Sequence, residues 1–264
     1  MDLVEKVALV TGGGIRVGQA ICLGLAAAGA HVVVHYNSSA GPAEETAAQA
    51  RCVGVQAVTV QADLTEPTSA STVVQAALER FGRVDILVHA ASPFVRGSLR
   101  EVDLGTWRRL MAILVESFLL LVQGVAPGMV QRGQGTVMAI LDVGAFEPWP
   151  DYLAHGVGKA ALWALLRSLA VELAPQVRVN AVVPGLVLPP PGLTEKQNAQ
   201  MAARTLMGRW GTPQDVVDAI LFLARSEYIT GEALVVDGGA KWAHRRPGSR
   251  GSWVGGPAAG GGCL

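Results

Sequence analysis

The chain has little charge and few cysteines. Only 16% of its 264 residues are charged, and 21 lysine and arginine residues balance 21 aspartate and glutamate residues. This balance predicts neither a nucleic acid nor an anionic membrane surface as a partner. The three cysteines (Cys22, Cys52 and Cys263) have no metal-ligand or redox spacing, so neither a metal site nor a disulfide framework is expected, and the pattern fits the reducing cytoplasm.

Long uninterrupted apolar segments are also lacking. No apolar run reaches the roughly 20 residues of a membrane-spanning helix, and a strand pattern rather than a signal peptide begins the chain. Because half of the residues are hydrophobic, we expect one α/β domain with a sizeable core over residues 1–243. Residues 244–264 are rich in Gly, Pro, Ser and Arg, which predicts a disordered tail; a basic interaction segment is the alternative.

Short apolar runs alternate with helical patterns along the first 243 residues. This alternation predicts a single Rossmann-type doubly wound parallel sheet with helices on both faces, a three-layer α/β/α fold. Residues 107–130 are predicted to form one long helix, residues 194–207 a polar helix, and Thr212 with Pro213 the start of another helix. The expected strands are residues 7–10, 32–34, 55–60, 86–88, 136–141, 177–183 and 233–236.

A glycine-rich turn follows the first expected strand. Gly12, Gly13, Gly14 and Gly18 lie between that strand and a helix. Glycine lets the backbone approach a pyrophosphate, and a helix N-terminus offers unpaired N–H groups. The context predicts a dinucleotide site; a tight turn without a ligand is the alternative.

The end of the second strand bears on the choice of dinucleotide. NAD sites usually place a carboxylate there for the ribose hydroxyls. The residues present are His35, Tyr36, Asn37, Ser38 and Ser39. These donors, together with Arg16, favour the 2′-phosphate of NADPH, although His35 and Tyr36 could simply cap the strand. Asp63, after the third strand, could bind an adenine amino group or equally serve as a turn residue.

Residues 142–159 gather ionisable side chains where a strand ends and a helix begins. The stretch contains Asp142, Tyr152, His155 and Lys159, and ligands of open α/β sheets bind outside the carboxyl ends of strands. His155 and Lys159 lie four residues apart and so share a helix face, which Tyr152 can join. A solvent-facing helix start explains the segment when it is taken alone; the rest of the chain favours an active site.

Over about residues 5–242 these features resemble the short-chain dehydrogenases/reductases. The glycine turn, Lys159, Asn180 and the closing residues 229–239 fall in the family's order. The resemblance implies the following cofactor contacts: Gly12, Gly14, Ile15, Arg16, Gly18, His35, Tyr36, Asn37, Ser38, Ser39, Asp63, Leu64, Ala90, Ala91, Ser92, Lys159, Pro184 and Gly185. In this reading Lys159 binds the nicotinamide ribose.

Within the family, the chain is most similar to pteridine reductases and dihydromonapterin reductases. This likeness rests on Arg16, on the His35-Tyr36 pair and on Asp142, which stands where most members have serine. It implies NADPH-dependent reduction of a dihydropterin or similar heterocycle, with Arg16, Phe94, Asp142 and Tyr152 at the substrate. Family members commonly pair long helices into tetramers, so a homotetramer or homodimer is expected through the helix over residues 107–130 and the apolar helix that follows Lys159. The alternative is that both helices are wholly buried in the monomer.

Three positions depart from the family pattern. The catalytic tyrosine four residues before the lysine is His155, the relay asparagine of the long helix is Leu114, and the turn after strand four is His89-Ala90-Ala91-Ser92. We predict that His155 or Tyr152 donates the proton with help from Asp142, since Tyr152 has the spacing to Lys159 that enoyl reductases use. A carbonyl or enoyl reductase and a catalytically silent NADP-binding protein are the alternatives.

Overall fold

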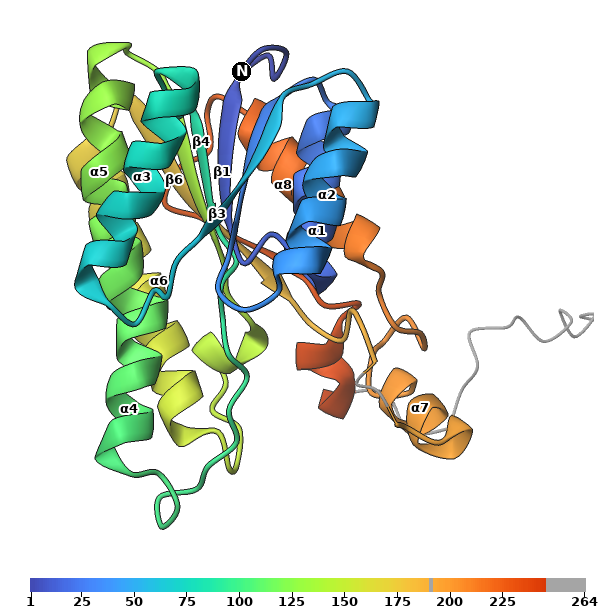
Figure 1. Ribbon diagram of the computed structural model, residues 1–264. Coiled ribbons are helices and arrows are strands. Elements are labelled where there is room, and N and C mark those ends of the chain that lie inside the picture. Colours follow the sequence, from blue (N-terminus) through green and yellow to red (C-terminus); the bar gives the residue numbers. More distant parts are fainter. Residues whose placement is uncertain (190–191, 246–264) are drawn as a thin grey trace, which may run out of the picture.

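The computed structural model describes residues 1–189 and 192–245 of the chain. Seven parallel strands form one sheet in the order β3-β2-β1-β4-β5-β6-β7 (Figure 1). The strands are β1 (Val7–Thr11), β2 (His31–Tyr36), β3 (Ala57–Gln61), β4 (Ile86–His89), β5 (Gly135–Ile140), β6 (Val177–Pro184) and β7 (Ala233–Val236). All seven were predicted to within one or two residues at each end, and the doubly wound α/β class is confirmed.

Helices cover both faces of the sheet (Figure 1). Helix α1 (Arg16–Ala27) packs against α2 (Ala40–Cys52) and α8 (Pro213–Arg225) on one face. On the other face, α5 (Ser117–Gln131) packs against α3 (Pro67–Phe81) and α6 (Leu153–Leu173). Each face encloses its own apolar core, which is why the strands are apolar on both sides.

Local capping explains where several helices begin. Thr212 and Asp215 form a capping box at the start of α8, as the Thr212-Pro213 pattern predicted. Thr194 caps α7 (Glu195–Ala202) in the same way, but α7 ends earlier than the predicted residue 207. The buried Thr205 hydroxyl bonds the N–H and the carbonyl of Arg209, and these bonds favour a turn over a further helical turn.

The predicted helix over residues 107–130 is longer than expected and contains a π turn. It begins as α4 (Leu104–Met111), passes through the π turn η1 (Ala112–Glu116) and continues as α5. Asp103 sets the earlier start because its carboxylate accepts a hydrogen bond from Thr106 N–H at 2.6 Å.

By length and composition alone, this helix of 28 residues could cross a membrane, although the sequence was expected to contain no such segment. The apolar run is interrupted by Glu116, Ser117 and Gln123, but three polar residues do not exclude a span. Half of its most apolar window is buried inside the protein, as in the core helix of a layered fold.

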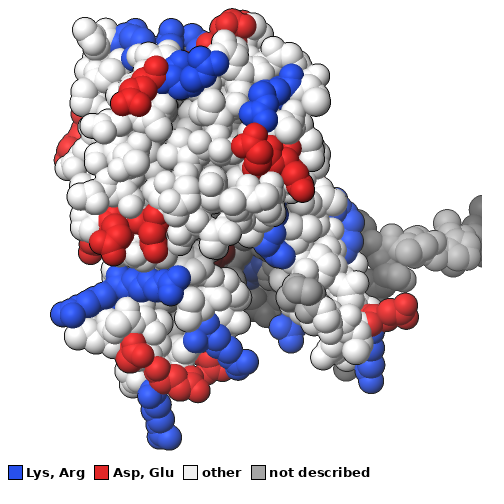
Figure 2. All heavy atoms as spheres, in the orientation of Figure 1, with Lys and Arg blue, Asp and Glu red and all other residues white. Residues whose placement is uncertain are grey.

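The C-terminal part of the described chain is a short 3-10 helix, η3 (Ala240–Arg245). It continues past the predicted domain boundary after residue 243. Residues 246–264, which carry most of the predicted tail and Cys263, lie outside the described residues. On the face that Figure 2 shows, acidic and basic side chains are interspersed, as their equal numbers lead one to expect.

The register of the strands positions the site. Thr11 of β1 pairs with His89 of β4, and His89 pairs with Ala139 of β5, so these strands end at nearly the same level. Because β1 lies between β2 and β4, the winding of the chain reverses at β1. Ligand crevices of open α/β sheets form at such a reversal, outside the carboxyl ends.

The glycine turn after β1 gives the first testable prediction. A Cβ on Gly18 would overlap the carbonyl oxygen of Gly12, whereas a Cβ on Gly41 in α2 would meet open space. We expect Gly18→Ala to lower the free energy of unfolding by about 1–3 kcal/mol, because the turn must shift. Urea denaturation measures the change. The matched control, Gly41→Ala, should be neutral or slightly stabilising; equal effects of the two variants would contradict the close contact.

Candidate active site

The glycine turn is held in place by a buried histidine. His35 Nδ1 accepts a hydrogen bond from Gly12 N–H at 3.2 Å, and His35 Nε2 lies 3.1 Å from the Ala62 carbonyl oxygen. The His35 carbonyl also accepts from Gly13 N–H at 2.8 Å. Burial lowers the pKa of His35 to about 4, so the ring is neutral. Both ring nitrogens are engaged, so the His35 side chain supports the glycine turn, and a contact of His35 with the cofactor stays a prediction.

The N-terminus of α1 offers its first N–H groups to the crevice. The N-cap residue Ile15 provides no side-chain cap, and no acidic residue lies in the first turn. A helix end of this kind suits an anionic ligand. Gly12 also lies so close to the Ala91 backbone that a Cβ would meet it at 2.9 Å. Both features suit a pyrophosphate, and its binding at this turn stays a prediction.

Of the polar residues beyond β2, Ser39 lies beside the glycine turn. Asn37 and Ser38 are exposed, and a Cβ on Gly14 would lie 2.8 Å from Ser39 Oγ. Arg16 is exposed, and its guanidinium donates to the Leu188 carbonyl oxygen at 3.4 Å. The Arg16 side chain thus extends from the glycine turn toward the loop after β6.

Asp63 is engaged in its own turn. Its Oδ1 accepts hydrogen bonds from the N–H and the hydroxyl of Thr65 at 3.0 and 2.9 Å. These bonds lower the pKa of Asp63. Of its two predicted roles, the turn role is therefore observed, and the contact with adenine stays a prediction. Leu64, which follows it, is buried.

A second buried histidine joins β1, β4 and the π turn. His89 Nδ1 lies 3.0 Å from Thr11 Oγ1, and His89 Nε2 lies 3.0 Å from the Ile113 carbonyl oxygen. Thr11 Oγ1 accepts from Ala90 and Ala91 N–H, both at 3.1 Å, so its own hydrogen points to His89 Nδ1 and His89 Nε2 carries the ring hydrogen. Burial, together with the Lys159 charge, lowers the pKa of His89 to about 3. Sequence reasoning missed this role, although a histidine ending an apolar strand was a signal.

Asp142 and His155 are brought together as a hydrogen-bonded pair. Asp142 Oδ2 lies 2.7 Å from His155 Nε2, and the His155 side chain is 1% exposed. The carboxylate accepts, so Nε2 carries a hydrogen and Nδ1 is the atom free to exchange a proton. Asp142 Oδ1 and His155 Nδ1 are buried without a hydrogen-bond partner among the described residues. Unpartnered buried polar atoms are costly, so each of these two atoms could bond a water or a ligand atom.

Lys159 shares the buried helix face with His155, as predicted. Its Nζ donates to the Ile140 carbonyl oxygen at 2.7 Å. Burial lowers the pKa of Lys159 to about 8, and the Asp142 charge partly opposes this shift. Leu114 is fully buried and fills the space beside Gly158, where a Cβ would meet Leu114 Cδ1 at 2.6 Å.

Tyr152 lies just outside helix α6, although its ring still contacts that of His155. It is the N-cap residue of α6, with φ −130° and ψ 37°, so it lies before the first helical turn. Its ring centroid is 6.4 Å from that of His155 and 4.7 Å from that of Phe94. Trp149, which sequence reasoning missed, packs beside both Phe94 and Tyr152.

The ends of β6 and β7 complete the rim. Gly185, after Pro184, donates its N–H to the Val236 carbonyl oxygen at 3.0 Å.

Asn180 Nδ2 donates to the Ile229 carbonyl oxygen at 2.8 Å, and its Oδ1 accepts from Glu232 N–H at 3.1 Å. Asn180 therefore has a structural role between these strands.

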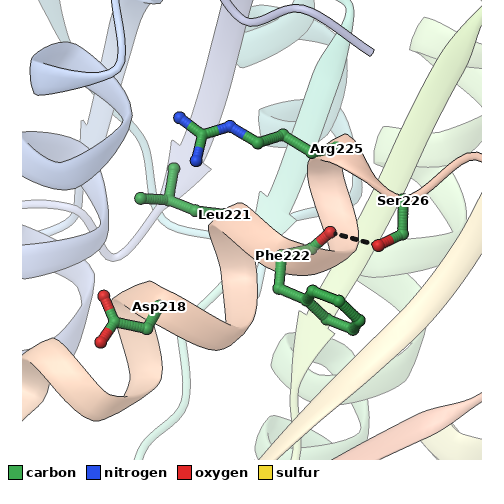
Figure 3. Close-up of a pocket in the computed structure, with 5 residues that line it drawn as sticks. All are labelled: Asp218, Leu221, Phe222, Arg225 and Ser226. Carbon is green, nitrogen blue, oxygen red and sulfur yellow. Dashed lines mark hydrogen bonds between the residues drawn. The ribbon is translucent and has the colours of Figure 1, made fainter.

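Elsewhere, a hollow of about 370 Å3 lies on α8, lined by Asp218, Leu221, Phe222, Arg225 and Ser226 (Figure 3). The N-terminal ammonium bonds the Arg225 carbonyl oxygen, which places this end of α8 at the opposite rim of the sheet from Asp142. The hollow is therefore separate from the candidate active site. Within the described residues, no group of three or more His, Cys, Asp and Glu side chains could hold a metal ion.

Comparison with known proteins agrees with this geometry. A family model described as enoyl-(acyl carrier protein) reductase matches residues 14–241. L-rhamnose 1-dehydrogenase (NAD(P)(+)) of Sphingomonas sp. is 33% identical, over 90% of this chain and 98% of that protein. The chain belongs to the short-chain dehydrogenase/reductase family.

Other short-chain dehydrogenases/reductases are similar over comparable lengths. 3-Oxoacyl-[acyl-carrier-protein] reductase of Synechocystis sp. is 31% identical, over 90% of this chain and 97% of the relative. The crystal structure of acetoin dehydrogenase from Salmonella typhimurium superposes with a TM-score of 0.83 at 30% identity, covering 90% of this chain and 96% of that one. The predicted family is confirmed, while its pteridine reductase subtype is not among these findings.

The two buried histidines, His35 and His89, predict that the free energy of unfolding decreases as the pH is lowered. Unfolded histidines take up protons near pH 6.5, whereas the folded pKa values are about 4 for His35 and about 3 for His89. Below about pH 6.5 the unfolded chain thus binds more protons, and stability falls as pH falls, by up to about 1.4 kcal/mol per pH unit for each histidine. Urea denaturation between pH 4 and 7 measures this slope.

The variants His35→Asn and His89→Asn test the assignment. Each should be less stable at pH 7, because it loses a buried hydrogen bond, yet should show a shallower loss of stability on acidification. An unchanged slope in both variants would show that neither histidine is responsible.

Proposed function

We propose that the protein catalyses NADPH-dependent reduction of a carbonyl compound to an alcohol, and the reverse oxidation, with His155 as the proton donor. The observation that carries this proposal is the 2.7 Å hydrogen bond between His155 and Asp142, one helical turn before the buried Lys159. The relatives described above, which are named as dehydrogenases or reductases, support the reaction class.

The residues of the crevice fit a phosphorylated dinucleotide. The uncapped N-terminus of α1 and the close contacts of Gly12 and Gly18 suit a pyrophosphate. Arg16 is the exposed cation beside that turn, and no carboxylate stands at the end of β2, which favours NADPH over NADH. When bound, the cofactor supplies a hydride from its nicotinamide. The Lys159 ammonium has two further hydrogens beyond the one that bonds Ile140, which it can offer to ribose hydroxyls.

The Asp142–His155 pair can supply the proton of the reduction. In the protonated ring, Nε2–H bonds Asp142 and Nδ1–H is the acidic group. When the carbonyl carbon takes up the hydride, His155 Nδ1 transfers its proton to the carbonyl oxygen. The ring is then neutral and retains the Nε2–H bond to Asp142. In the oxidation direction, Nδ1 accepts the alcohol proton. Asp142 therefore fixes which nitrogen faces the reacting oxygen.

A second candidate is the reduction of a pterin-like ring, as the sequence predicts. Arg16, Phe94 and the carboxylate of Asp142 favour it, because a pterin has basic nitrogens and a flat ring. None of the relatives reported above is named for this reaction. Turnover of dihydrobiopterin or dihydrofolate, measured beside simple ketones by NADPH absorbance, decides between the two candidates.

The proposal includes a homo-oligomer in the cytoplasm. Helix α6 exposes Leu153, Val157 and Val171, the last with 81% of its surface accessible, so its outer face is apolar enough to pair with a second copy. Light scattering of the purified protein gives the oligomeric state.

The proton donor is tested by substitution. We expect His155→Phe to lower kcat for ketone reduction by about 10^2–10^4-fold, because it removes the proton. Asp142→Asn should also lower kcat, since the amide no longer fixes the ring with an ionised acceptor. Steady-state NADPH oxidation measures both variants, and fluorescence binding of NADPH confirms that each still folds.

The competing donor is Tyr152. If Tyr152→Phe abolishes turnover while His155→Phe retains it, Tyr152 is the acid and the proposed mechanism is wrong. A different outcome is that the wild-type protein binds NADPH but does not oxidise it when ketones, quinones or pterins are added at any pH between 5 and 8. The protein is then a catalytically silent dinucleotide-binding member of the family.

The choice of cofactor is tested at Arg16. We expect Arg16→Ala to raise KM for NADPH about tenfold, as a lost charge-assisted hydrogen bond would, and to leave KM for NADH nearly unchanged. Arg100→Ala, an exposed arginine of the loop after β4, is the matched control. Equal effects on both cofactors would remove the basis for a 2′-phosphate contact.

A further inference from the structure

Three aromatic side chains form a cluster beside the Asp142–His155 pair. Phe94 comes from the loop after β4, and Trp149 and Tyr152 come from the loop before α6. Phe94 lies 4.7 Å from Tyr152 and 6.3 Å from Trp149 between ring centroids, and Trp149 lies 6.0 Å from Tyr152. We call these three residues the aromatic clamp.

The aromatic clamp adjoins the proton donor and is open to solvent. Phe94 meets the His155 ring in an edge-on contact at 4.9 Å and 78°. Its side chain is nevertheless 61% exposed, so much of the ring is free to contact another molecule. A molecule that packs on the exposed part of Phe94 would therefore lie close to the His155 ring.

The two loops that carry the clamp are fastened to each other. Gly97 N–H donates to the Asp151 carbonyl oxygen at 2.6 Å, and Leu153 N–H donates to the Gly97 carbonyl oxygen at 3.2 Å. Arg96 and Asp151 form an ion pair at 2.6 Å. Asp151 has φ +64°, a conformation that costs energy outside glycine and that these bonds maintain. The rings are therefore positioned before a substrate arrives.

We propose that the aromatic clamp makes the enzyme select a carbonyl group joined to a flat ring, such as an aryl ketone, over a polyhydroxylated or saturated substrate. The inference rests on the proposed reductase function. Aromatic faces bind flat rings through offset or edge-on packing. A sugar instead requires several hydrogen-bonding side chains, and the clamp offers only two polar groups, the Tyr152 hydroxyl and the Trp149 indole N–H. In the reaction the carbonyl carbon gains the hydride, the oxygen gains the His155 proton, and the ring stays unchanged.

The test compares two ketones of similar size, acetophenone and cyclohexyl methyl ketone. They differ in whether the ring is flat. We measure kcat/KM for each with NADPH in the full-length protein and in Phe94→Leu, which keeps apolar bulk but removes the flat ring. We expect Phe94→Leu to reduce kcat/KM for acetophenone about five- to tenfold and to leave cyclohexyl methyl ketone within about twofold. Leu99→Ala, an exposed apolar residue of the same loop, should change neither.

A binding measurement separates this inference from the proposed function. Calorimetric titration with acetophenone in the presence of NADP should show weaker binding in Phe94→Leu, whether or not turnover occurs. If NADPH is oxidised but Phe94→Leu affects both ketones equally, or if L-rhamnose is oxidised with higher kcat/KM than 1-phenylethanol, the clamp does not select flat rings and the reductase proposal stands. If acetophenone binds the clamp yet no compound oxidises NADPH, the selection stands and the reductase proposal fails.

Discussion

The candidate active site depends on the strands β1, β4 and β5 ending at nearly the same level of the parallel sheet. The register pairs Thr11 with His89 and His89 with Ala139, so the segments that follow these strands leave the sheet at one rim. There the glycine turn, the Ala90-Ala91 backbone and Asp142 come within reach of one another, although about 130 residues separate the first from the last. Without this register, the glycine turn and the Asp142–His155 pair would not lie at the same rim of the sheet.

Two neutral histidines stabilise the rim by hydrogen bonds that a charged ring could not make. His35 accepts from the glycine turn, and His89 links Thr11 to the carbonyl of Ile113 in the π turn. Each ring uses one nitrogen as an acceptor and the other as a donor, so protonation would break a bond as well as bury a charge. These bonds also explain the π turn, because the Ile113 carbonyl oxygen accepts hydrogen bonds from both His89 Nε2–H and the Ser117 hydroxyl.

In the proposed mechanism, the acid–base group is the hydrogen-bonded pair of Asp142 and His155. Where the family has a tyrosine and a serine, His155 and Asp142 share a hydrogen bond, and the position of the relay asparagine is filled by Leu114. Because Asp142 Oδ2 accepts a hydrogen bond from His155 Nε2–H, the proton that His155 could exchange with a substrate is on Nδ1. Phe94 contacts the same ring edge-on, with 4.9 Å between the ring centroids.

The sequence by itself determined the alternation of strands and helices, the glycine turn, the capping box at Thr212 and the shared face of His155 and Lys159, because periodicity and capping act over a few residues. Only the tertiary structure decided that His35 and His89 are buried hydrogen-bonding groups, that Tyr152 stands outside the helix, and that Phe94 meets Trp149. Burial, tautomer and loop contacts depend on segments about 25 to 55 residues apart in the chain, and local pattern carries no information about how such segments meet in space.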